Sequence, residues 1–238
     1  MSLPKLIHFR PAVCVFFIWL AALLCACGFI DQFSPTPTAT AAPTRTRLPT
    51  ITPDPSNTPP PPGRTIGNLN SKVSLVIYAD FQDPYSKQYY RDTEEQLLTD
   101  YVKTGKISYT YKYFPVIDQD RLGESHWSAY AAECANDQGK FWEYHDKLYY
   151  EYRGPNSGAF TRDNLKKYAS DLNLDTKTFN QCLDSDKYAM LVYDQLYEAL
   201  QLRLPGSPYF LLNGRKLDTP TLAYDEFWKP IEAELKIR

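Results

Sequence analysis

The stretch VSLVIYADFQDPYSKQYY, residues 73–90, joins a run of apolar residues to the start of a helix. Its first six residues are mostly β-branched or apolar, as in a strand that is covered on both faces. Pro84 suits the first turn of a helix, and good helix formers continue from Tyr85 to Lys103. The stretch therefore predicts a buried strand that leads directly into a helix.

The segment after this helix predicts a second strand. Gly105 ends the helix, and the strand-like run KISYTYKYF, residues 106–114, is closed by Pro115. Strand, helix and strand within about 45 residues form a βαβ unit, whose crossover is right-handed and whose two strands we expect to be parallel.

The rest of the chain predicts a helical block, a hairpin and a final helix. Residues 121–203 have helical character, and turn residues divide them into four or five helices. YFLLNGRKL, residues 209–217, contains the two-residue turn Asn213-Gly214 and predicts a β-hairpin. A last helix is expected at about residues 222–236. This order predicts an α/β fold with a helical domain inserted at about residues 118–204.

Three motifs, in this order, are similar to those of one known family. VSLVIYADFQDPYSKQYY is similar to the family's strand, Asp-Phe pair and active-site helix, and AAECANDQGKFWEYHDKLY, residues 131–149, to its helical insert. PGSPYFLLNGRKL, residues 205–217, is similar to its cis-proline loop and hairpin. Over residues 66–238 the chain therefore resembles the DsbA-like thioredoxin-fold family of extracytoplasmic thiol-disulfide oxidoreductases. The resemblance implies a thioredoxin-like fold, βαβ followed by ββα, with an inserted α-helical domain.

The chain departs from this family at the active site. The family has a Cys-Pro-x-Cys motif at the start of its first helix, where the helix amino terminus stabilises a thiolate. The matching residues here are Asp83, Pro84, Tyr85 and Ser86. Neither Asp83 nor Ser86 can form or resolve the mixed disulfide on which thiol–disulfide exchange depends. We therefore expect no redox exchange, and no other catalytic residue, at these positions.

The replacement residues suggest other roles. Asp83 is expected to cap the helix, since its carboxylate can accept from free backbone N–H groups there. The alternative is a carboxylate that binds a cationic group of a ligand. Ser86 is expected to be a small polar replacement, because a hydrolytic serine needs a base and the sequence identifies none.

Pro208 follows Gly206-Ser207 and matches the family's cis-proline. The resemblance implies that this loop faces the active-site positions and presents backbone groups to an extended peptide, which could pair with it as a strand does. Tyr85, Ser207 and Pro208 are therefore the candidate peptide-binding residues. The alternative is that Pro208 only shapes the end of the sheet.

Cys134 and Cys182 are the two cysteines that follow the amino-terminal segment, and both lie in predicted helices. In an oxidising compartment such a pair is most simply explained by a structural disulfide. A second redox-active pair and two buried free thiols are the alternatives. No metal or cofactor is expected, because His126 and His145 lack the close spacing of zinc ligands relative to these cysteines.

Residues 1–30 have the pattern of a secretory signal. Lys5, His8 and Arg10 precede the uncharged run PAVCVFFIWLAALLCACGFI, residues 11–30. The end of that run resembles a bacterial lipobox, so Cys27 is the expected site of lipidation. An uncleaved transmembrane helix is the alternative, because twenty apolar residues can span a bilayer. Both interpretations anchor the chain to the membrane and place the rest outside the cytoplasm.

Residues 31–65 are rich in proline and threonine. Proline removes backbone donors and favours extended conformations, so no packed core can form in such a segment. We expect a disordered linker between the anchor and the folded domain.

The charge balance argues against a nucleic-acid partner. The chain has 26 Lys and Arg against 28 Asp and Glu, and residues 64–238 hold 22 of the basic and 26 of the acidic groups. Without a basic excess there is no electrostatic drive toward phosphate backbones.

The expected partner is an extracytoplasmic polypeptide, bound by a module that has lost redox activity. The alternative function is a thiol-disulfide oxidoreductase that uses Cys134 and Cys182 or a cysteine-bearing partner.

Overall fold

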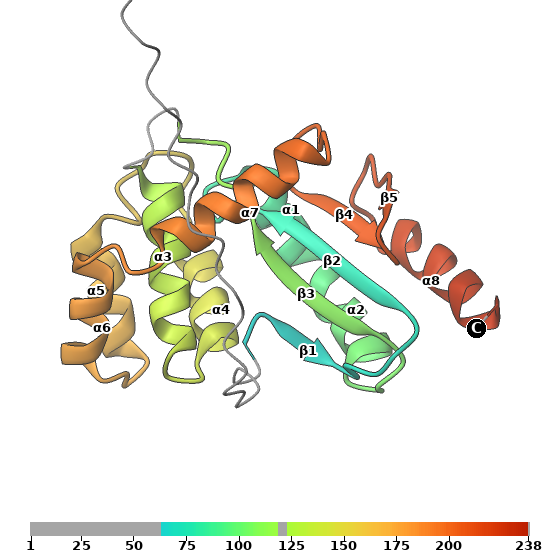
Figure 1. Ribbon diagram of the computed structural model, residues 1–238, viewed down its shortest axis with the longest axis horizontal. Helices are drawn as coiled ribbons and strands as arrows, with labels where there is room; N and C mark the ends of the chain where they lie inside the picture. Colours follow the sequence, from blue (N-terminus) through green and yellow to red (C-terminus); the bar gives the residue numbers. More distant parts are fainter. Residues whose placement is uncertain (1–62, 119–122, 238) are drawn as a thin grey trace, which may run out of the picture. The chain divides into compact units, whose positions relative to one another are not determined.

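Five strands form one mixed sheet in the computed structural model, which describes residues 63–118 and 123–237. The strands are β1 (Thr65–Gly67), β2 (Ser74–Ala79), β3 (Ser108–Tyr113), β4 (Tyr209–Leu212) and β5 (Arg215–Leu217). Their spatial order is β1-β3-β2-β4-β5 (Figure 1). β2 and β3 are parallel, as the βαβ unit predicts, whereas the other three pairs are antiparallel.

The helix between β2 and β3 contains two π-helical turns. It consists of α1 (Pro84–Tyr89), η1 (Tyr90–Glu94), α2 (Glu95–Leu97) and η2 (Leu98–Val102), which follow one another without a break. The sequence predicted this helix within one residue at each end. It did not predict the π-helical turns, because helix propensity and apolar periodicity do not distinguish them from an α-helix.

In the described residues, five helices lie between β3 and β4, and one follows β5. They are α3 (Glu124–Asn136), α4 (Phe141–Glu151), α5 (Arg162–Asp171), α6 (Thr176–Asp184), α7 (Ala189–Gln201) and finally α8 (Asp225–Ile237). In Figure 1, α3 to α6 lie beside the sheet and α7 crosses one of its faces. This arrangement confirms the α/β fold with an inserted helical block.

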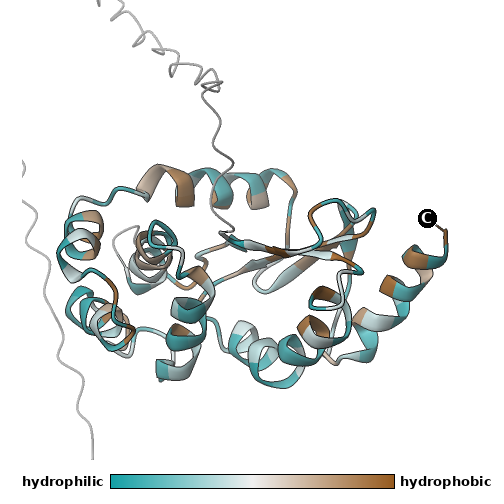
Figure 2. Cartoon of the chain, turned by 90° about the horizontal axis from the view of Figure 1, so that it is seen from below, coloured by the Kyte–Doolittle hydropathy of each residue, from teal (hydrophilic) through white to brown (hydrophobic). Residues whose placement is uncertain are grey.

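Both faces of the central strand β2 are covered. Leu75, Ile77 and Ala79 belong to the main hydrophobic cluster. Val76 and Tyr78 point the other way, into a smaller cluster that includes side chains of α7. Figure 2 shows the sheet nearly edge-on with helices on both sides. The apolar composition of the first quoted strand is explained by this double covering.

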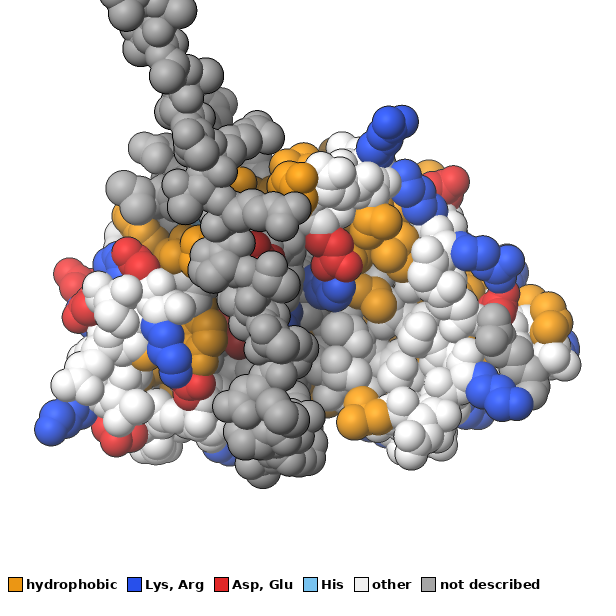
Figure 3. Space-filling model, viewed as in Figure 1, with side chains coloured by type: hydrophobic (Ala, Val, Ile, Leu, Met, Phe, Trp, Pro, Cys, Tyr) orange, Lys and Arg blue, Asp and Glu red, His pale blue; other side chains and the backbone are white. Residues whose placement is uncertain are grey.

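The outer side of α7 carries exposed apolar side chains. Met190, Tyr197 and Leu200 are all exposed, and Tyr193 stacks on Tyr197 with 6.5 Å between ring centroids. Figure 3 shows hydrophobic side chains on this face of the molecule.

The short strand β1 was not predicted. Thr65 to Gly67 pair antiparallel with Thr110 to Ser108, and the Thr65 and Thr110 hydroxyls lie 2.9 Å apart. We assigned Thr65 to the linker, because three residues after a proline-rich segment carry no strand periodicity of their own. The partner strand β3 supplies the hydrogen bonds that make them a strand.

Several sequence-based expectations fall outside the described residues. These are the signal or anchor at residues 1–30, the lipidation site Cys27 and the linker as far as residue 62. Within residues 63–118 and 123–237, none of the helices combines the length and the apolar character needed to cross a membrane.

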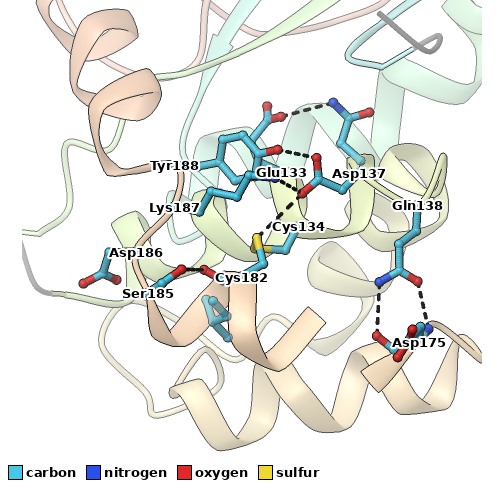
Figure 4. The surroundings of a disulfide bond; sticks show 12 residues. Glu133, Cys134, Asp137, Gln138, Asp175, Cys182, Ser185, Asp186, Lys187 and Tyr188 are labelled. Atoms are coloured by element: carbon cyan, nitrogen blue, oxygen red, sulfur yellow. Dashed lines mark hydrogen bonds and ion pairs between the residues drawn. A yellow bond between two sulfur atoms is a disulfide. The ribbon is translucent and has the colours of Figure 1, made fainter. Parts of the chain in front are cut away.

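Cys134 in α3 and Cys182 in α6 form a disulfide (Figure 4). Their Cα atoms are 5.8 Å apart, and the residues are only 1% and 7% exposed. Beside the bond, Asp137 accepts from the Lys187 ammonium at 2.7 Å and from the Tyr188 hydroxyl. The predicted structural disulfide is therefore present, and the two cysteines are not free thiols.

Removal of this disulfide should destabilise the domain. The bond closes a separation of 48 residues, and the chain-entropy model gives about 4 kcal/mol for a loop of that length. We expect the full-length double variant Cys134→Ala, Cys182→Ala to unfold at clearly lower urea concentration than the wild type. The control Ser185→Ala leaves the bond intact and should unfold near the wild-type midpoint. Equal midpoints for the cysteine variant and the wild type would contradict the prediction.

Candidate functional site

The four residues that match the family's active-site motif lie at the start of α1. Asp83 is the N-cap residue, and Pro84 to Ser86 form the first turn. Tyr85 is 62% exposed and Pro84 is also exposed, whereas Asp83 and Ser86 are only 3% and 0% exposed. The two residues at the cysteine positions are therefore buried, and the two between them face solvent.

Asp83 caps the helix, as predicted. Its Oδ1 accepts from the Tyr85 N–H at 3.1 Å, and its Oδ2 accepts from the Ser86 N–H at 2.9 Å. The Ser86 hydroxyl also donates to Oδ2, at 2.8 Å. These three bonds occupy both carboxylate oxygens, so the geometry favours the cap over a carboxylate kept for a cationic ligand.

The loop before β4 contacts this cap directly. The Ser207–Pro208 peptide bond is cis, and Ser207 Oγ lies 2.9 Å from Ser86 Oγ. Ser207 Oγ also accepts from the Asp80 N–H at 2.9 Å. Because the single Ser86 hydroxyl hydrogen is donated to Asp83, Ser207 must be the donor to Ser86. The resulting chain of hydrogen bonds runs from the Asp80 N–H through both hydroxyls to the Asp83 carboxylate.

Asp80 holds the end of β2 to two other segments. Its Oδ2 accepts from the N–H groups of Val116 and Ile117 at 2.9 and 3.0 Å, and from the Ser125 hydroxyl at 2.8 Å. Its Oδ1 accepts from the Gln82 N–H at 2.8 Å. Asp80 belongs to the first motif, but the sequence analysis gave it no role. Its position as an acidic residue directly after a buried strand was the feature that could have indicated one.

Gln82 extends this buried polar group toward the helical insert. Its amide nitrogen donates to Asp118 Oδ1 at 2.8 Å and to Ser125 Oγ at 2.9 Å. Its amide oxygen accepts from the Asn156 N–H at 2.6 Å. Asp118 also lies 3.1 Å from His126 Nδ1. His126 is thus a partner of Asp118, a contact that its position in the sequence did not indicate.

Burial raises the pKa of both carboxyl groups near the helix start. The pKa of Asp80 rises to about 6, against the opposing effect of the hydrogen bonds that it accepts. Burial also raises the pKa of Asp83, and the bonds from Ser86 oppose that rise. Both shifts have the same cause, because the ionised forms lose hydration inside the protein.

The arrangement offers little to nucleophilic or metal chemistry. The Ser86 hydroxyl donates to the Asp83 carboxylate and pairs with the Ser207 hydroxyl, and neither partner is an imidazole or amine base of the kind that activates a nucleophilic serine. Across residues 63–118 and 123–237, no three or more His, Cys, Asp or Glu side chains are grouped so that they could hold a metal ion. What the site presents to solvent is a proline, a tyrosine and the adjoining cis-proline loop.

The pKa of Asp80 predicts how stability depends on pH. The value of about 6 lies above the ordinary 3.8, so between these values the folded state binds the proton more tightly than the unfolded chain. The free energy of unfolding should therefore fall as the pH rises from about 4 to about 7, by roughly 3 kcal/mol for the full shift. Urea unfolding of the full-length protein at several pH values measures this slope.

In the variant Asp80→Asn, the free energy of unfolding should lose this dependence on pH. The control Asp163→Asn changes an exposed residue and should keep the wild-type slope. Parallel pH profiles for Asp80→Asn and the wild type would show that Asp80 does not titrate as described.

Several known proteins are similar to this chain in sequence or fold. A curated relative, the probable disulfide bond formation protein D of Bacillus anthracis, is 25% identical over 177 residues, which cover 73% of this chain and 78% of that protein. The oxidised BdbD structure from Bacillus subtilis matches with a TM-score of 0.64 at 21% identity, over 73% of this chain and 93% of that one. DsbA of Chlamydia trachomatis matches with a TM-score of 0.65 at 16% identity, over 82% and 99%.

A different kind of protein also contains a related segment. The Na(+)/H(+) antiporter NhaA 1 of Salinispora arenicola is 33% identical over 150 residues, which cover 63% of this chain. This chain spans 21% of that antiporter and 22% of a second one, from Salinispora tropica. The similarity therefore concerns one segment of those longer proteins.

The sequence profile of the family described as Thioredoxin matches residues 60–233. That range contains the sheet, the helical insert and the start of the helix at Asp83. Because this profile covers well over half of the chain, the chain belongs to the Thioredoxin family, and the structural matches show that its fold is DsbA-like.

Proposed function

We propose that this chain is a membrane-anchored, extracytoplasmic binding module, which holds a polypeptide at the surface formed by Pro84, Tyr85 and Pro208 without exchanging disulfides there. The observation that carries the proposal is the state of the two cysteine positions. Asp83 and Ser86 are buried and bonded to each other, and Ser86 is bonded to Ser207. Neither the Asp83 carboxylate nor the hydrogen-bonded Ser86 hydroxyl can replace the thiolate that attacks a disulfide.

The retained parts of the site support peptide binding. The loop at Ser207–Pro208 lies against the first turn of α1, where the side chain of Tyr85 is exposed. An exposed tyrosine provides a large contact surface at low entropic cost, and aromatic residues are enriched at protein interfaces. An extended peptide beside such a loop can gain affinity from main-chain hydrogen bonds.

Two observations support a location at the membrane. The basic and then apolar pattern of residues 1–30 is that of a signal or anchor. In addition, two relatives of this domain are named as Na(+)/H(+) antiporters, which are membrane proteins by that name.

The second candidate function is a thiol-disulfide oxidoreductase, and the names of the Bacillus relatives favour it. Such an activity would have to use Cys134 and Cys182 or a cysteine of a partner. Both cysteines are buried between α3 and α6, where a client thiolate has little access to either sulfur. The geometry therefore supports the binding module better.

Redox assays separate the two candidates. We expect the full-length wild type to show no turnover in dithiol oxidation or insulin reduction. The double variant Asp83→Cys, Ser86→Cys should gain measurable dithiol oxidation, because the helix amino terminus favours a thiolate at residue 83. Turnover by the wild type that Cys134→Ser abolishes would establish the second candidate. A folded double variant that stays inert would show that these positions are not equivalent to the family's active site.

Photocrosslinking tests the peptide-binding surface. A photoreactive residue in place of Tyr85 should label an unfolded polypeptide, such as reduced and alkylated ribonuclease, several-fold more than the same residue in place of Tyr197. Tyr197 is a matched control, because it is 53% exposed but lies on α7. Equal labelling from the two positions would contradict the proposed surface.

A further inference from the structure

A stripe of exposed apolar side chains runs along the outer side of α7. Met190, Tyr193, Tyr197 and Leu200 are spaced three, four and three residues apart, so they share one face of the helix. Each of them is between 38% and 57% exposed. The opposite face of α7 is buried where the helix crosses the sheet (Figure 1). We call these four side chains the α7 stripe.

The α7 stripe is aromatic in its middle and uncharged. The Tyr193 and Tyr197 rings are nearly parallel, with 15° between their planes and 6.5 Å between their centroids. From Met190 to Leu200 the stripe is about 15 Å long, at about 1.5 Å per helical residue. With about 200 Å² for each large apolar side chain, the exposed fractions leave about 400 Å² of apolar surface. A stable protein–protein interface buries about 800 Å² on each partner, so the stripe is small for a second protein and suits one extended segment.

The segment that precedes the described part of the chain is rich in proline. Residues 54–62 read DPSNTPPPP, in which five of nine residues are proline and Asp54 alone is charged. Proline favours the polyproline II conformation, whose segments bind to surfaces lined by aromatic side chains. At about 3.1 Å per residue, nine residues in this conformation span about 28 Å, which is more than the length of the stripe.

The described chain begins close to α7. Gly63 is followed by Arg64, whose carbonyl accepts from the Tyr111 N–H of β3 at 2.8 Å. The Arg64 guanidinium lies over the ring of Tyr113, also in β3, at 5.5 Å from its centroid. The Tyr113 N–H donates in turn to the Gln195 side chain of α7 at 2.8 Å. One strand thus contacts both the start of the described chain and α7, so the stripe lies within reach of residues 54–62.

We propose that residues 54–62 dock on the α7 stripe of the same chain, with proline rings packed against the Tyr193 and Tyr197 rings. The stripe carries no charge, and Asp54 is at the end of the segment farthest from Gly63, so apolar groups meet without burial of an ion. Because the segment is covalently joined to the domain, docking loses little entropy of association and a small contact area is sufficient. Docking covers the stripe and fixes the direction in which the amino-terminal part of the chain leaves the domain.

This inference goes beyond the proposed function and does not rest on it. Its occupant is a segment of the same chain, and its surface is on α7, whereas the proposed peptide-binding surface consists of Pro84, Tyr85 and Pro208. Failure of client crosslinking at Tyr85 therefore leaves this proposal unaffected. Failure of the docking test likewise leaves the peptide-binding surface unaffected.

Photocrosslinking within the full-length chain tests the docking. A photoreactive residue in place of Asp194, which is exposed and adjoins the stripe, leaves both stripe tyrosines intact. We expect it to crosslink to residues 54–62, as located by fragmentation of the tryptic peptide of residues 48–64. Serine in place of the four prolines at residues 59–62 keeps the length of the tether but removes the rings. That change should lower the crosslink yield at least about threefold, because the apolar contact is lost.

Two matched controls separate docking from mere nearness of the tether. Serine at four more distant prolines should leave the yield unchanged; these are Pro35, Pro37, Pro43 and Pro49. Tyr197→Ala should lower the yield as the serine change at residues 59–62 does, whereas Tyr150→Ala, at a 78% exposed residue of α4, should not. Tyr197 is 53% exposed, so its loss leaves the packed core intact.

Four results would overturn the proposal. The first is a wild-type chain without crosslinks to residues 54–62, and the second is an equal yield after the serine change at residues 59–62. The third is an unchanged yield in Tyr197→Ala. The fourth is a crosslink between two chains in place of one within the chain, which would assign the stripe to a second copy.

Discussion

Burial of two polar residues at the helix start is the constraint on which the site depends. Asp83 and Ser86 are almost fully buried, and a buried polar group without a partner is costly. Hydrogen bonds that run from the Asp80 N–H through the Ser207 and Ser86 hydroxyls to the Asp83 carboxylate give both residues partners. That chain joins the end of β2, the loop before β4 and the first turn of α1, so the geometry at the helix start and the cis-proline loop are fixed together.

The same burial makes the start of this helix differ from the active-site motif of DsbA-like proteins. In the family, the helix amino terminus stabilises a thiolate that must be able to reach a client sulfur. Here the helix amino terminus is already occupied by the Asp83 carboxylate, and the exposed groups are Pro84 and Tyr85. The Cys134–Cys182 disulfide lies elsewhere, buried between α3 and α6. The proposed binding role rests on this contrast between an exposed contact surface and the absence of cysteine at residues 83 and 86.

One helix carries two buried polar sites. At its start, Asp83 and Ser86 bond to each other, to backbone N–H groups and to Ser207. Two turns later, Glu94 lies against β3 and α4, where its Oε1 accepts from the Tyr109 hydroxyl and its Oε2 lies 3.7 Å from His145 Nε2. Both sites join the helix to neighbouring segments through buried polar contacts.

The sequence by itself determined the order of the elements from β2 to α8 and the helical insert, and it favoured the cap at Asp83 and the pairing of Cys134 with Cys182. These follow from periodicity, turn residues, a helix-start signal and the count of cysteines, all of which are local or compositional. Tertiary structure alone decided strand β1, the role of Asp80, and the meeting of Glu94 with His145. Each of these depends on groups far apart in the chain, such as Thr65 with Thr110 or Asp80 with Ser125. Hydrogen-bond partners brought together by packing leave no periodic signal in the sequence.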